Sequence, residues 1–123
     1  DNSLVAVLAD GMGGLSYGAC AAKIISDSIL ATVIDKIQGC SPEDVLRMAF
    51  DAADSAIYRK CRELKCRMGA AVTVALAMGD SLYYACEIIQ SVGRRIILID
   101  NRPYRGRRRR HIFNTMCQRE GVS

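Results

Sequence analysis

Apolar residues in the first third of the chain follow two patterns, one typical of a strand and one of a helix. Residues 4–9 (LVAVLA) form a continuous apolar run, which predicts a buried strand rather than a half-exposed alternating one. Residues 18–37 carry an apolar side chain at every fourth position, which predicts a helix with one broad buried face. These positions are Ala21, Ile25, Ile29, Val33 and Ile37, and Ala22, Leu30 and Ile34 widen the stripe. Gly39 follows, as is common after the end of a helix.

A second helix is predicted after residue 41, where several signals for a helix start stand together. Ser41 suits the capping position and Pro42 the first turn. The acidic residues 43–44 complement the positive end of the helix dipole. The positions predicted to face the core are Leu46, Ala49, Phe50, Ala53 and Ile57.

The second half of the chain changes to the short apolar runs that are typical of strands. Residues 72–77 and 82–89 are predicted strands, and the intervening residues 78–81 (MGDS) resemble a hairpin turn. A third strand is predicted at 96–99 and a short helix at 111–119. The order of elements predicts an α/β fold of the layered α+β type, with helices packed on one face of a largely antiparallel sheet.

Length and composition indicate one globular domain. The chain has 123 residues, enough for a single hydrophobic core, and half of them are apolar, which excludes a disordered chain. No uninterrupted apolar run approaches the roughly 20 residues of a membrane span, and no signal peptide pattern is present. We therefore expect a single domain over residues 1–123, no membrane association and a cytoplasmic location.

The cysteines do not have the spacing of a zinc site or a disulfide framework. They are Cys20, Cys40, Cys61, Cys66, Cys86 and Cys117. Three fall within predicted helices or strands, and no Cys-x2-Cys pair is present. We expect six reduced thiols, with a secreted disulfide framework as the less favoured alternative. Cys20 lies near a helix start, where the pKa of a thiol can be lowered, but a packing role is the favoured interpretation.

The first strand ends in a pattern that suits a hard cation. Asp10 follows the apolar run, and three of the next four residues are glycines: Gly11, Gly13 and Gly14. The carboxylate supplies charge, a neighbouring carbonyl can turn inward, and the missing side chains leave room for water. The alternative interpretation is an ordinary glycine turn between a strand and a helix.

Three segments in order resemble the metal-dependent protein serine/threonine phosphatases of the 2C type. The signature is residues 9–14 (ADGMGG) before a helix start rich in small residues. Residues 68–76 (MGAAVTVAL) are similar to the family's MGTT strand, with Ala70 and Ala71 in place of both threonines. Residues 82–86 (LYYAC) resemble the next strand. The resemblance implies that this chain corresponds to about the N-terminal half of the family's domain. It would therefore form half of the family's layered α-β-β-α sandwich.

What the resemblance implies about chemistry centres on Asp10. The family holds two divalent cations, Mg²⁺ or Mn²⁺, between its sheets by carboxylates and water. A metal-bound water attacks the phosphorus of phosphoserine or phosphothreonine in a protein substrate. Carried over, Asp10 is the catalytic residue that bridges the metals, and Gly11 is a metal ligand through its carbonyl.

The family's other ligands do not align well with this chain. The upstream acid has Asp1 as its sole candidate, which an extended strand would hold far from Asp10. The family's Gly-Asp-Ser-Arg motif has only a weak counterpart at 93–95 (GRR), where arginine replaces the acid. Residues 79–81 (GDS) precede the strand instead of following it, and a turn explains them better. The remaining acids belong to the half of the domain that this chain lacks.

The segment 94–110 is strongly basic. It holds eight arginines and one acid, a net charge of +7 against +4 for the whole chain, and is densest at Arg105–Arg110. A solvated or partner-facing loop is favoured, which could recruit an acidic or phosphorylated partner. Phosphopeptide contact comes next, and nucleic-acid binding is the least favoured alternative. His111 is interpreted as a helix-start residue rather than a catalytic acid.

Two hypotheses follow for the function. The first is that the parent domain hydrolyses phosphoserine and phosphothreonine in proteins, this chain alone being incomplete. The chain begins with Asp1 rather than Met, so we expect a processed or excised product. The second is an inactive phosphatase-like binding or regulatory module that uses the arginine-rich segment 94–110. An isolated half-domain would also expose apolar sheet surface, so we expect self-association.

Overall fold

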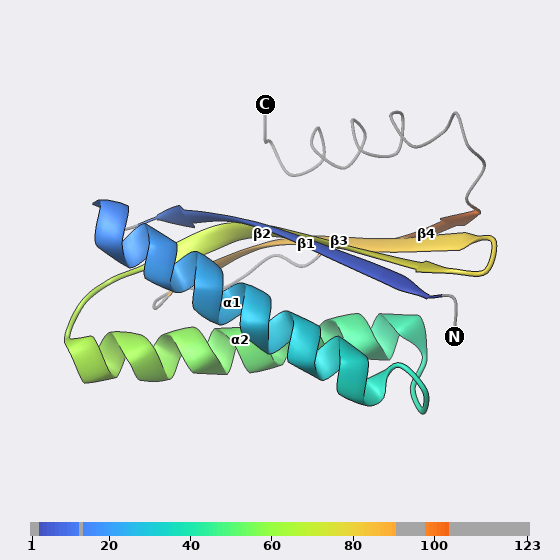
Figure 1. Cartoon of the computed structure of the whole chain (residues 1–123), viewed down its shortest axis with the longest axis horizontal. Helices are drawn as coiled ribbons and strands as arrows, with labels where there is room; N and C mark the ends of the chain where they lie inside the picture. Colours follow the sequence, from blue (N-terminus) through green and yellow to red (C-terminus); the bar gives the residue numbers. More distant parts are fainter. Residues whose placement is uncertain (1–2, 13, 91–97, 104–123) are drawn as a thin grey trace.

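The computed structural model describes residues 3–12, 14–90 and 98–103, which form a helical layer on a four-stranded antiparallel sheet (Figure 1). The elements are β1 (Leu4–Met12), α1 (Gly14–Lys36), α2 (Pro42–Leu64), β2 (Gly69–Met78), β3 (Ser81–Gln90) and β4 (Leu98–Pro103). The strand order is β1-β2-β3-β4, and both helices pack on the same face of the sheet. The predicted fold class is confirmed.

Helix α2 begins and ends with defined caps. The Ser41 hydroxyl accepts a hydrogen bond from the backbone N–H of Asp44 at 3.2 Å, and Pro42 occupies the first turn. At the other end Lys65 adopts a left-handed conformation, with φ of 51°. The predicted helix start at residues 41–42 is confirmed, because the signals that set it are local.

Helix α1 begins earlier than predicted, at Gly14 instead of residue 18, and ends at Lys36. Over Tyr17–Lys36 it is long and apolar enough to cross a membrane, with a mean hydropathy of 1.4. Its apolar stripe is nevertheless buried against α2 and the sheet, and its opposite face carries a salt bridge of 3.1 Å between Lys23 and Asp27. Only 28% of that apolar segment is buried, so α1 packs through one stripe and is not enclosed by the rest of the described structure.

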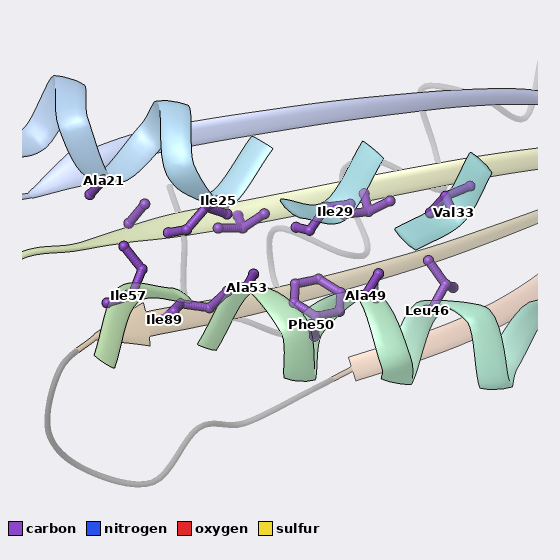
Figure 2. Close-up of a cluster of buried hydrophobic side chains, with 14 of the residues drawn as sticks. Ala21, Ile25, Ile29, Val33, Leu46, Ala49, Phe50, Ala53, Ile57 and Ile89 are labelled. Atoms are coloured by element: carbon purple, nitrogen blue, oxygen red, sulfur yellow. The ribbon is translucent and has the colours of Figure 1, made fainter. Parts of the chain in front are cut away.

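The hydrophobic core lies between the two helices and the inner face of the sheet (Figure 2). Helix α1 contributes one row of side chains and α2 another, and β2 and β3 close the third side. The fully buried helical residues include Ala21, Ile25, Ile29, Leu46, Ala49, Phe50, Ala53 and Ile57. The regularly spaced core positions predicted for both helices are therefore confirmed, except that Ile37 follows α1 and is only partly buried. Of the residues predicted to widen the α1 stripe, Ala22 and Leu30 are partly buried, but Ile34 is 71% exposed and the prediction is wrong there.

The hairpin between β2 and β3 was correctly predicted. Met78 and Ser81 pair across it, which leaves Gly79 and Asp80 as the two turn residues. Gly79 has a φ of 58°, and glycine adopts this backbone conformation without steric cost. The sequence Gly79-Asp80-Ser81 therefore forms a turn and the start of a strand.

The first strand is less buried than predicted. Its residues alternate between half-buried and exposed positions, with Leu4 72% and Leu8 65% exposed. The helices cover only the inner face of the sheet, and β1 is an edge strand, so its apolar outer face is open among the described residues. The prediction of a buried strand is wrong for this reason.

The predicted third strand at 96–99 overlaps β4, which begins at Leu98. Several other sequence-based predictions lie outside the described residues. The predicted helix at 111–119, Asp1, the arginines at 105–110 and Cys117 are not among the residues described.

Candidate metal centre

Asp10 stands near the C-terminal end of β1, on the outer face of the sheet. Its side chain is exposed, as are those of Leu8 and Met12 on the same face of the strand. Its pairing partner on the neighbouring strand β2 is Ala71. The helices pack on the opposite face, so the Asp10 carboxylate is accessible from the side of the sheet that they leave open.

Gly11, the second predicted ligand, has a packing reason to be glycine. A Cβ atom at Gly11 would lie only 1.9 Å from the carbonyl oxygen of Gly18 in α1. A Cβ atom at Gly18 would be 3.2 Å from the Gly11 backbone. The two glycines therefore let the first turns of α1 cross directly over the end of β1, beside Asp10. This contact explains Gly11 independently of any metal.

The two alanines that replace the family's threonines lie on opposite faces of β2. Ala70 pairs with Gly11 and is fully buried toward the helices, whereas Ala71 lies opposite Asp10 and is half-buried. Alanine brings no oxygen ligand to the position beside Asp10. The next polar contact along the outer face joins the Thr73 hydroxyl and the Cys86 thiol, which are 3.3 Å apart.

The described residues do not by themselves fit a two-metal centre. Among them, no group of three or more His, Cys, Asp or Glu side chains is arranged to hold a metal ion. A hard divalent cation takes about six oxygen ligands, and two close cations need several carboxylates. Asp10 with one backbone carbonyl supplies two oxygen-bearing groups. Further carboxylates must come from outside the described residues for such a centre to form.

One buried carboxylate was not assigned by sequence reasoning. Glu87 lies in β3 opposite Val72 and is only 2% exposed, facing the helices. It is near Asp10 in the sheet register but on the opposite face, so it does not join the Asp10 site. The sequence signal for Glu87 is a single acid within the apolar run 82–89. The run alone does not show which face of the sheet this side chain occupies.

The five described cysteines are free thiols, as predicted. Cys20 is half-buried and packs against the core, in agreement with the favoured interpretation. The pKa of the Cys66 thiol is raised by desolvation and by the neighbouring Cys61, with a smaller contribution from Cys20.

Two other proposed sites remain predictions. The remnant motif at 93–95 and the dense arginine run with His111 are outside the described residues.

Comparison with solved structures identifies the fold. The serine/threonine phosphatase PstP/Ppp of Mycobacterium tuberculosis matches 82% of this chain at 21% identity with a TM-score of 0.67. The catalytic domain of PstP, solved in complex with two manganese ions, gives the same identity and TM-score. A stage II sporulation E family protein from Thermanaerovibrio acidaminovorans matches 70% of the chain at 29% identity, with a TM-score of 0.54.

The match covers only part of these proteins. The chain spans 63% and 62% of the two phosphatase chains and 40% of the sporulation protein. No protein-family model and no curated protein matches the sequence. The expected resemblance is confirmed in three dimensions: the chain has the fold of part of a 2C-type serine/threonine phosphatase domain.

Proposed function

We propose that this chain is part of a metal-dependent protein phosphatase domain that hydrolyses phosphoserine and phosphothreonine in proteins. The observation that carries the proposal is the position of Asp10, an exposed carboxylate near the end of β1, on the face of a phosphatase-like sheet that lies opposite the two helices. The manganese ions of the PstP catalytic domain support a metal-dependent chemistry for this fold.

In this proposal Asp10 and the Gly11 carbonyl are two ligands of Mg²⁺ or Mn²⁺, and the rest of the domain supplies the others. When bound, the metal ions supply a Lewis acid and an activated water for phosphoester hydrolysis. In this proposal the described residues hold Asp10 in a defined position. The Gly11–Gly18 contact holds the strand end against α1, and pairing with β2 holds it in the sheet.

The test is phosphatase activity of the complete parent protein on a phosphothreonine peptide with Mn²⁺. Asp10→Asn keeps the size of the side chain but removes its charge, so we expect kcat/KM to fall by at least about 100-fold, or about 2.7 kcal/mol. Asp80→Asn, in the exposed hairpin turn, is the matched control and should retain activity. Equal activity in the two variants would refute the assignment of Asp10.

A second function is favoured by Ala71 opposite Asp10 and by the lack of a grouped ligand set in the described residues. In this version the chain is a phosphatase-like binding module whose arginine-rich segment holds acidic or phosphorylated partners. Binding to a phosphopeptide should weaken as salt increases and be lost when residues 107–110 become alanine. Binding that is independent of salt would contradict this function.

We also propose that the protein is cytoplasmic, and the five free thiols support a reducing compartment.

A further inference from the structure

Two cysteines stand at the C-terminal end of α2, joined through the backbone. The N–H of Cys66 donates a hydrogen bond to the carbonyl of Cys61 at 3.1 Å, and the intervening Lys65 is left-handed. This is the bond of a Schellman motif, in which the first residue after the left-handed position returns to the last turn of the helix. Side chains at these two positions commonly contact each other.

Both cysteines also pack against the hydrophobic core at the junction of α2 and β2. Cys61 is buried, and its Sγ lies 3.9 Å from the Met68 carbonyl oxygen, beyond Cys66 in the chain. Cys66 is half-buried. Desolvation raises the pKa of the Cys66 thiol and the nearby Cys61 adds to the rise, which is consistent with two neighbouring thiols. Cys66 is therefore the accessible member of the pair and Cys61 the enclosed one.

We propose that Cys61 and Cys66 form a reversible disulfide when the protein meets a small disulfide oxidant of the glutathione type. The Cys66 thiolate attacks oxidised glutathione, forming a mixed disulfide and releasing one glutathione thiolate. The Cys61 thiolate then attacks the Cys66 sulfur, which forms the intramolecular disulfide and releases the second glutathione. Each cysteine loses its proton to solvent, and the two electrons reduce the glutathione disulfide.

The bridge would act at the end of the molecule that carries Asp10. The connection after Cys66 leads into Gly69, which pairs with Met12, and Ala71 two residues later pairs with Asp10. A covalent link between the end of α2 and this connection would tether the start of β2. Oxidation would therefore restrict the strand that lies beside Asp10.

The test is to incubate the full chain at increasing ratios of oxidised to reduced glutathione and to block free thiols with N-ethylmaleimide. Trypsin cleaves between the two cysteines, so mass spectrometry identifies the linked peptides. We expect a Cys61–Cys66 bridge that increases with the oxidant ratio and disappears with dithiothreitol. The Cys20→Ala control should leave the bridge unchanged.

The Cys66→Ala variant changes a half-buried position and leaves the buried Cys61 in place. This variant should lose the bridge. Peptide mapping of the wild-type protein remains the main measurement. Three outcomes would overturn the proposal: glutathione retained on Cys66 without a bridge, pairing of Cys66 with another cysteine, or no oxidation of either residue. None of these results depends on phosphatase activity.

Discussion

Replacement of Gly11 by alanine should destabilise the protein much more than a glycine-to-alanine change usually does. The added Cβ would lie 1.9 Å from the Gly18 carbonyl oxygen and 2.4 Å from its carbonyl carbon. Both obstructing atoms are backbone, so no side chain can rotate away, and α1 must move by about 1 Å or more off β1. Overpacking of this kind costs about 1–3 kcal/mol, and we expect the upper end of that range.

The assay is urea unfolding followed by circular dichroism, with two further variants in the series. In Gly18→Ala the added Cβ would lie 3.2 Å from the Gly11 backbone, a milder overlap. The higher helix propensity of alanine offsets the cost of this overlap by about 1 kcal/mol. Gly39→Ala places its Cβ in open space and should change the unfolding free energy by less than about 0.5 kcal/mol. If Gly11→Ala is as stable as Gly39→Ala, the close contact between β1 and α1 is refuted.

Three further predictions concern the core, the Cys66 thiol and the exposed outer face of β1. Phe50→Ala should lower the unfolding free energy by about 3–5 kcal/mol, measured in urea, because a fully buried ring leaves a cavity. Cys66, whose pKa is raised, should react more slowly with iodoacetamide at neutral pH than a solvated thiol and accelerate as pH rises, followed by mass spectrometry. Leu8→Lys should reduce self-association in analytical ultracentrifugation, since it places charge on the exposed face of β1.

Each of these three predictions would be contradicted by a specific result. A small effect of Phe50→Ala, similar to that of Tyr58→Ala at an exposed position, would contradict the described core. Fast alkylation of Cys66 at neutral pH would contradict the shift in its pKa. Self-association unchanged by Leu8→Lys would show that the outer face of β1 is not the contact surface.

The helices and the hairpin could be predicted because their signals are local. Ser41 and Pro42 set the start of α2 through contacts within one turn, and Gly79 allows the reversal between β2 and β3. The core stripe of each helix follows from its own periodicity. These predictions did not depend on how distant segments meet.

The exposure of β1 could not be predicted in this way. A continuous apolar run indicates apolar residues on both faces of a strand, but it does not show whether a second layer is present. In the described structure the helices cover one face, and Leu4 and Leu8 remain exposed on the other. The helix start was also placed too late, because residues 14–17 give no strong periodic signal.

The candidate site could be located but not completed. The acid after an apolar run followed by glycines placed Asp10 just after the first strand, whereas β1 continues through Asp10 to Met12. The role of Gly11 in packing depends on Gly18, seven residues away, and their contact exists only after α1 folds back over the strand. Partner carboxylates for Asp10 would come from distant segments, which a single strand and turn do not reveal.

The central claim is that Asp10 is a metal ligand in a phosphatase domain. The most direct test is calorimetric titration of Mn²⁺ into the complete parent protein, with Asp10→Ala and Asp80→Ala beside the wild type. Both changes remove one exposed carboxylate, so net charge is matched between the variants. The account predicts that Asp10→Ala loses Mn²⁺ binding and that Asp80→Ala keeps it. Undiminished binding by Asp10→Ala would contradict the account.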